Sequence, residues 1–111
     1  MAARTLHLPD WPFGAAGRRQ LLDALLRDEQ PPNGWRKTEL ESRMGVANGG
    51  LVPHLPGAVD LGLAVVRDGL VHRADGAGDL ADALRVLLER VDALPDRAPL
   101  PVPRRPYQRR G

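Results

Sequence analysis

Apolar side chains recur with helical spacing in three stretches of the chain, and each predicts an amphipathic helix. In residues 17–29 four leucines form one stripe, while charged side chains occupy the other face. In residues 37–44 Leu40 and Met44 face inward, and Gly45 suits the left-handed position that ends a helix. Residues 79–94 carry a continuous aliphatic stripe between Asp79, a plausible N-cap, and Pro95.

A hairpin is predicted for "LAVVRDGLVHRA", residues 63–74. Two runs rich in β-forming residues flank Asp68-Gly69, a pair typical of the type I′ turn, which needs positive φ at both central positions. Trp35, just ahead of the second helix, is expected in an edge strand or in the core.

The stretch "NGGLVPHLPGAVDLGL", residues 48–63, combines one apolar helical face with two prolines on the outer stripe. Two geometries are open. The helix starts late, near Pro53 or His54, so that both prolines fall in its first turn, or it starts at Gly50 and is kinked. The late start costs less, because proline inside a helix costs roughly 3 kcal/mol.

These elements divide the chain into three parts. Residues 1–16 are expected to form an extended apolar arm that packs Trp11 and Phe13 across the body or docks a partner protein. Residues 17–94 form the folded domain. Residues 95–111 form a disordered tail rich in proline and arginine, which is a simple soluble end, an arm attracted to nucleic acid, or a PxxP-type ligand through "PRRP".

Length and composition restrict the class of protein. The 111 residues suffice for one small domain, and the chain has no run of 18 apolar residues, so no membrane span is expected. There is no cysteine, which excludes disulfides and suits a reducing cytosol. A secretory signal is also not expected, because Pro9, Asp10 and Pro12 interrupt the N-terminal segment. We therefore expect a cytoplasmic protein.

The net charge of +2 is unevenly distributed. Residues 18–95 carry ten basic and twelve acidic side chains, whereas residues 96–111 carry five arginines against Asp96. The folded body is therefore slightly acidic, which weakens the case that the whole domain is a surface for nucleic acid.

The order of predicted elements resembles the winged helix-turn-helix family of bacterial transcriptional regulators. "TELESRMGVANGGLVPHL" is similar to the second helix, turn and entry to the recognition helix of that family, and "LGLAVVRDGLVHR" to the wing. The resemblance implies a mainly α fold with a small β-hairpin, a winged helix-turn-helix with an added C-terminal helix.

What the resemblance implies about function is double-stranded DNA binding, with the recognition helix in the major groove, the wing on the backbone, and often a homodimer. It places Arg36, Lys37 and Arg67 near phosphates, and Asn48 and His54 near base edges. Arg73 is added to the predicted DNA contacts as part of a basic rim with Arg36, Lys37, Arg43 and Arg67. The leading hypothesis is thus a small DNA-binding transcriptional regulator. The competing interpretation is that the basic residues belong to an ordinary solvated surface, where Glu39, Glu41 and Asp68 balance their charge.

Two features leave a second hypothesis open, a winged-helix module that binds protein and not DNA. The outer stripe of residues 49–60 has no Arg, Lys or Gln to match base edges, and Asp60 would repel phosphate.

The aliphatic stripe of the C-terminal helix either covers the body or, as we expect, forms a dimer contact. Its proposed dimerisation residues are Leu80, Leu84, Leu87, Leu88 and Val91.

No enzyme, cofactor or metal site is expected. Ser42 is the single serine and lies on a charged helix, the glycine-rich stretches lack the context of a phosphate loop, and the three histidines are widely scattered.

Overall fold

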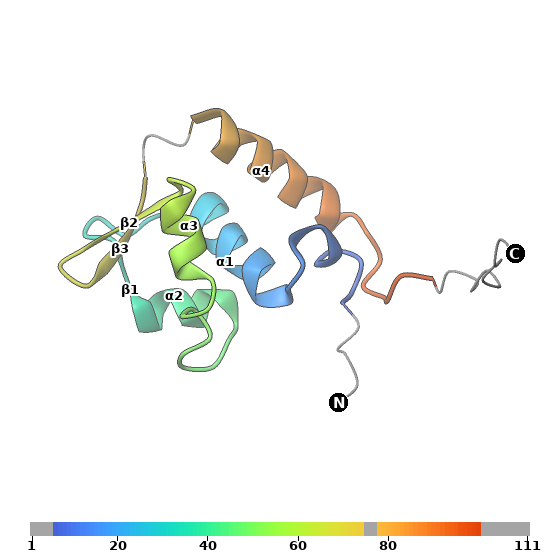
Figure 1. Ribbon diagram of the computed structural model, residues 1–111, viewed down its shortest axis with the longest axis horizontal. Coiled ribbons are helices and arrows are strands. Elements are labelled where there is room, and N and C mark those ends of the chain that lie inside the picture. The colour runs from blue at the N-terminus through green and yellow to red at the C-terminus, as the bar shows by residue number, and fades with distance from the viewer. Residues whose placement is uncertain (1–5, 75–77, 101–111) are drawn as a thin grey trace, which may run out of the picture.

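The computed structural model describes residues 6–74 and 78–100. Along this part of the chain the elements are the 3-10 turn η1 (Trp11–Phe13), α1 (Ala16–Arg27), β1 (Trp35–Arg36), α2 (Lys37–Met44), α3 (Leu55–Asp60), β2 (Ala64–Arg67), β3 (Leu70–Arg73) and α4 (Gly78–Asp92). The protein is thus a mixed α/β fold with a small antiparallel sheet, and the order from α1 to β3 is compatible with a winged helix (Figure 1).

The predicted hairpin is confirmed, but it belongs to a larger sheet. Asp68 and Gly69 have φ of 51° and 76°, the positive pair that a type I′ turn requires. β1 pairs antiparallel with β3, so the sheet has three strands in the order β1-β3-β2. The prediction that Trp35 lies in an edge strand or in the core is confirmed, because β1 is an edge strand that pairs Trp35 with Val71, and the Trp35 side chain is buried.

The strand register divides the sheet into two faces. Trp35 and Val66 both lie opposite Val71, so these three side chains share one face, and Trp35 and Val71 are buried there. The next row, Arg36 and Arg67 opposite Leu70, points to the other face. The alternation therefore separates an inner, helix-facing side of the sheet from an outer basic side.

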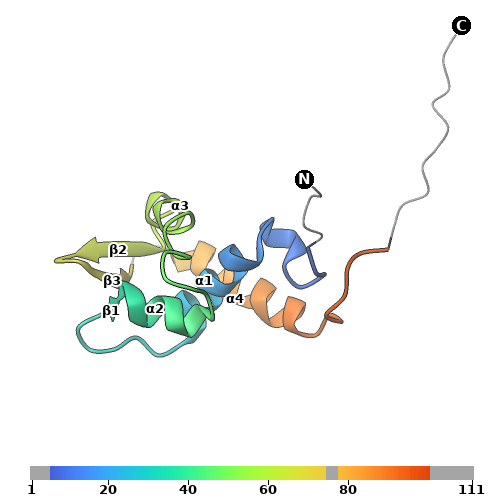
Figure 2. The same cartoon turned by 90° about the horizontal axis from the view of Figure 1, so that it is seen from below.

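Helix α1 lies in the middle of the molecule, with α2 on one side and α4 on the other (Figures 1 and 2). Its predicted apolar stripe is confirmed, since Leu21, Leu22, Leu25 and Leu26 are all buried. The side chains that are most completely buried come from every layer: Trp35, Leu21, Leu25, Leu40, Leu51, Leu63, Leu88 and Val71. The hairpin projects from one end of this core, and η1 lies at the other (Figure 1).

Helix α2 begins and ends where the sequence predicted. At its end Gly45 has φ of 74°, and its N–H donates to the carbonyl of Ser42. The N–H of Val46 donates to the carbonyl of Glu41 at 3.1 Å, which completes the Schellman pattern. The chain leaves α2 in a direction that these two bonds fix.

Helix α3 takes the late start. It begins at Leu55, with Pro56 in the first turn, and it has only six residues. Pro53 precedes it in a series of turns, in which the N–H of Val52 donates to Gly49 and that of His54 to Leu51. No interior amide is lost, because neither proline stands where a helix needs a donor.

Helix α4 corrects the prediction of a dimer contact. Leu88 and Val91 are 0% and 3% exposed within the monomer, and Leu84 and Leu87 pack partly against the core. Of the five residues predicted for dimerisation only Leu80 is exposed, at 40%. The aliphatic face of α4 therefore packs on α1 within the monomer. With 15 residues α4 is the longest described helix, and none in the described ranges could cross a membrane.

The two ends of the described chain are joined, which the sequence did not predict. The N–H of Leu8 donates to the carbonyl of Arg97 at 2.7 Å. Phe13 is buried as expected, but Trp11 is 64% exposed, and the turn at Trp11–Phe13 replaces the extended arm. Asp96 and Arg97 therefore contact the N-terminal segment, through His7 and Leu8, whereas residues 101–111, most of the predicted tail, lie outside the described residues.

Candidate functional site

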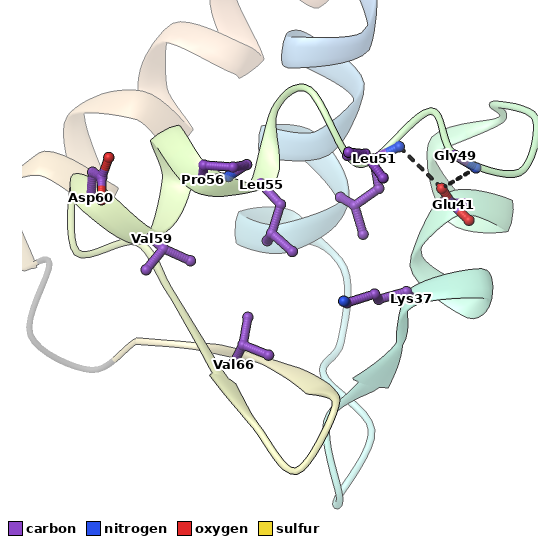
Figure 3. A pocket seen from close by; sticks show the side chains of 10 residues that line it. Lys37, Glu41, Gly49, Leu51, Leu55, Pro56, Val59, Asp60 and Val66 are labelled. Carbon is purple, nitrogen blue, oxygen red and sulfur yellow. Dashed lines mark hydrogen bonds between the residues drawn. The ribbon is translucent and has the colours of Figure 1, made fainter.

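An apolar groove lies between α3 and the inner face of the hairpin, and we call it the α3–β2 groove. It encloses about 520 Å³. Its lining comes from α2, the loop after it, α3 and β2: Lys37, Glu41, Gly49, Leu51, Val52, Leu55, Pro56, Val59, Asp60 and Val66 (Figure 3).

Aliphatic side chains dominate this lining, and several remain open to solvent. Val59 on α3 and Val66 on β2 are 39% and 40% exposed, and Val52 in the preceding turn is 67% exposed. Val66 points into the groove because it stands on the inner face of the sheet (Figure 3). The monomer thus leaves a continuous apolar surface uncovered, a feature typical of interaction sites.

Glu41 builds the loop side of the groove. Its Oε2 accepts hydrogen bonds from the N–H of Gly49 at 2.7 Å and from the N–H of Leu51 at 3.1 Å, and the residue is 5% exposed. Its interpretation as a solvated surface charge was therefore wrong. The carboxylate gives these two loop amides a charged acceptor, and it fixes the backbone at Leu51, whose side chain lines the groove.

The groove has one charged residue toward each end. Lys37, the first residue of α2, reaches in from one side, and Asp60, the last residue of α3, lies at the other (Figure 3). In residues 6–74 and 78–100 neither side chain forms an ion pair. The groove therefore carries Lys37 and Asp60 as exposed charges with apolar surface between them, whereas its third charged residue, Glu41, is buried and accepts from the loop amides.

The residues predicted to contact DNA do not lie together on one face. Arg36 and Arg67 are exposed on the outer face of the sheet, whereas Lys37 lines the groove on the inner side. Asn48 is exposed in the loop between α2 and α3. A ligand that follows α3 would meet Lys37, but not the side chains of the outer row.

Arg73 has a structural role, which corrects its prediction as a phosphate contact. Its Nε donates to the carbonyl of Leu25 at 2.7 Å, Nη2 donates to the carbonyl of Asp28, and the guanidinium lies 6.0 Å from the centre of the Trp35 ring. Burial, together with the nearby Arg85 charge, lowers the pKa of Arg73. The side chain ties β3 to the end of α1, and backbone carbonyls already accept from its Nε and Nη2.

His54 is turned inward, so the prediction that it lies near base edges was also wrong. Its ring lies against Gly17 at the start of α1, where even one added methyl group would stand 2.7 Å from Nε2. Nδ1 is buried and finds no partner among the described residues. Burial, and secondarily the positive charge of Arg18, lowers the pKa of His54. The residue joins α3 to α1 and does not face the groove.

The sequence pattern missed the groove itself, although part of its signal was present. Counting back from the Asp68-Gly69 turn puts Val66 on the same face as Trp35, which marks an aliphatic side chain on the inner side of the wing. Nothing in the spacing of Glu41 distinguishes it from neighbouring surface acids, because its partners are backbone amides of a loop. Among the described residues no cluster of His, Asp or Glu is arranged to hold a metal ion.

Comparisons with protein-family models, with curated proteins and with solved structures gave no match to this chain.

Proposed function

We propose that this protein is a protein–protein interaction module with a winged-helix arrangement, and that its α3–β2 groove receives an apolar segment of a partner protein. The observation that carries the proposal is the groove's lining, in which exposed valines from two elements face each other and Lys37 is the one cation. Burying such surface against a partner is favourable by about 25 cal/mol per Å² of apolar area.

The same surface is poorly suited to reading DNA. The outer side of α3 carries Pro56, Val59 and Asp60, none of which donates a hydrogen bond to a base edge, and a carboxylate there repels phosphates. The short helix also leaves little length to lie along a major groove. These features favour protein as the ligand of α3.

DNA binding remains our second candidate, supported by a different face. Arg36 and Arg67 stand in one cross-strand row with Leu70 on the outer side of the sheet, and both are exposed. These two contacts would neutralise phosphates without reading sequence, and the affinity would fall with salt at a slope of about −0.9 per phosphate.

We also propose that the protein forms a homodimer through the part of α4 that the core leaves free. Leu80, in the first turn of α4, is 40% exposed. Leu80→Glu would then convert a dimer to a monomer in sedimentation equilibrium, and a monomeric wild type rules the contact out.

A displayed peptide library tests the groove. Peptides selected on the full-length protein are expected to bind wild type and to lose at least about tenfold in affinity to Val59→Glu, since burying a carboxylate among aliphatic side chains is costly. Val86→Glu on α4 is the matched control, because Val86 is also an exposed valine on a helix and does not line the groove. The proposal fails if no peptide distinguishes Val59→Glu from wild type.

Titration with random duplex DNA at low and moderate salt separates the two candidates. The interaction module binds no DNA through its body, so Arg67→Ala leaves any residual binding and its salt slope unchanged. A slope reduced by about one phosphate in that variant favours the DNA candidate instead.

A further inference from the structure

Strand β2 is an edge strand of the sheet, so one side of its backbone has no neighbouring strand in the described part of the chain. The N–H of Ala74 donates to the carbonyl of Leu63 at 3.0 Å, which makes these two residues a hydrogen-bonded pair. In an antiparallel ladder such pairs alternate with pairs whose backbone groups point away from each other. Counting along the register from that pair places the backbone groups of Ala64 and Val66 on the open edge.

Of these two positions only Val66 is accessible. Ala64 is 1% exposed, whereas Val66 is 40% exposed. The N–H and C=O of Val66 have no hydrogen-bond partner among the described residues. The Val66 side chain points into the α3–β2 groove (Figure 3), so a free backbone donor and acceptor lie at the rim of the groove.

This edge determines which backbone conformation suits an occupant. A backbone N–H or C=O that is buried without a partner costs about 1–3 kcal/mol. A helix satisfies its own backbone groups, so a helix that covered Val66 would leave both groups unpaired. An extended segment supplies an acceptor and a donor to them, and its residue opposite Val66 points its side chain to the same face of the sheet.

Arg67 determines the charge that suits the next position of such a segment. Arg67 is exposed on the outer face of the sheet and forms no ion pair within the described ranges. A side chain directly opposite it on an added strand has its Cβ about 4.5–5.5 Å away, and an acidic one is attracted. The charged residues of the groove, Lys37, Glu41 and Asp60, line its inner side and do not face this outer position.

Charge also disfavours two sources of a strand within the protein itself. Two copies that paired through their β2 edges at Val66 would place their Arg67 side chains diagonally, about 7–8 Å apart. Residues 101–111 carry four arginines and three prolines, so they add like charge and lack donors. An acidic segment of a different protein has neither disadvantage.

We infer that the occupant of the α3–β2 groove is an extended segment of a partner protein that adds a strand to the free edge of β2. It carries an apolar side chain in the groove beside Val66 and an acidic side chain next to it, beside Arg67. This inference rests on the proposed function and names the kind of partner segment that the groove receives.

The probe is a phage-displayed library of random peptides of about eight residues, selected on the full-length protein. Peptides that discriminate against Val59→Glu are the groove binders. They are expected to carry an acidic residue directly beside an apolar one.

Hydrogen exchange measured by NMR tests the free edge. In the free protein the Val66 amide should exchange much faster than the Arg67 amide, which points toward β3 in the ladder. A saturating groove-binding peptide should slow exchange at Val66 by at least about tenfold and change exchange at Arg67 little.

N-methylation of the peptide, one residue at a time, distinguishes a strand from a helix. In a strand, methylation should abolish binding where the amide bonds to Val66 and be tolerated at the adjacent residues, whose amides point away. In a helix, methylation at every interior position removes an internal hydrogen bond and should weaken binding.

Charge reversal tests the acidic position. Arg67→Glu is expected to weaken a groove-binding peptide by about three- to tenfold at low salt, because an attraction becomes a repulsion. The peptide with its acidic residue changed to Lys should recover on Arg67→Glu and lose affinity on wild type. Arg36→Glu is the matched control, since Arg36 lies in the same outer row but on β1, at the opposite edge of the sheet, and affinity should stay unchanged.

The outcomes separate the inference from the proposed function. Groove-binding peptides that leave exchange at Val66 unchanged, weaken at every methylated interior position or ignore Arg67→Glu overturn the added acidic strand and leave the groove as a protein site. Slow exchange at Val66 that appears without peptide as protein concentration rises assigns the edge to a second copy and also overturns it. If no peptide discriminates against Val59→Glu, the proposed function fails and this inference fails with it.

Discussion

Glu41 fixes the loop between α2 and α3 through two backbone amides. We expect Glu41→Ala to lower the free energy of unfolding by about 2–4 kcal/mol, because it leaves the amides of Gly49 and Leu51 without their charged acceptor. Glu41→Gln keeps an acceptor oxygen and should lose about half as much. Urea denaturation of both variants measures the effect, and a loss below about 1 kcal/mol for Glu41→Ala would show that the loop holds without the carboxylate.

His54 should make the stability of the protein sensitive to mild acid. The folded-state pKa lies below the ordinary value of 6.5, first because of burial and then because of Arg18. In the unfolded chain the ring takes up a proton near pH 6.5, while the folded state resists protonation. The contribution of the neutral His54 ring to the free energy of unfolding is therefore fully present above about pH 6.5. It is lost as the pH falls from there through the folded-state pKa.

The comparison of wild type with His54→Gln isolates this effect. The free energy of unfolding of wild type should fall relative to that of the variant between pH 7.5 and pH 5, measured in urea. If the free energy of unfolding depends on pH in the same way in the two proteins, His54 is not the cause of the acid sensitivity.

Helices α1 and α4 and the N-terminal turn are joined by a network of ion pairs. Arg19 pairs with Asp10 ahead of α1 and, at 3.5 Å, with Asp92 at the end of α4. Arg27 on the next turns of α1 pairs with Asp23 at 2.9 Å and also with Asp92, and these contacts raise the pKa of Arg27. The network fastens the two ends of the described chain to the central helix.

Removing its central cation should release those ends. We expect Arg19→Gln to cost about 1–2 kcal/mol, because the Arg19 and Asp10 side chains are both largely shielded from water. Hydrogen exchange should quicken at the Leu8 amide, which donates to Arg97. In Arg97→Gln, whose lost guanidinium bonds only the neighbouring Ala98 carbonyl among the described residues, stability should stay within about 0.5 kcal/mol of wild type.

The molecule as a whole gains its core by folding α4 back over α1. Leu88→Ala should therefore lower the free energy of unfolding by about 2–5 kcal/mol, the usual cost of a cavity in a packed core. Leu80→Ala, at the exposed end of the same stripe, should cost less than about 1 kcal/mol. Equal losses in the two variants, measured by urea denaturation, would contradict the separation of α4 into a buried and a free part.

The sequence by itself determined the local structure of this protein. The bounds of α2, its glycine cap, the turn at Asp68-Gly69 and the late start of α3 follow from interactions within a few residues, such as positive φ and the missing amide of proline. The apolar stripes also identified the inner sides of α1 and α4.

Only the tertiary structure decided what those surfaces meet. Spacing along a helix shows that Leu88 and Val91 share a face, but whether α1 or a second chain covers it depends on the path of the chain. The same is true of Arg73, held by carbonyls at the end of α1, of His54 against Gly17, and of the strand that Trp35 adds. Long-range packing is not encoded in local periodicity, and the α3–β2 groove arises where three such elements meet.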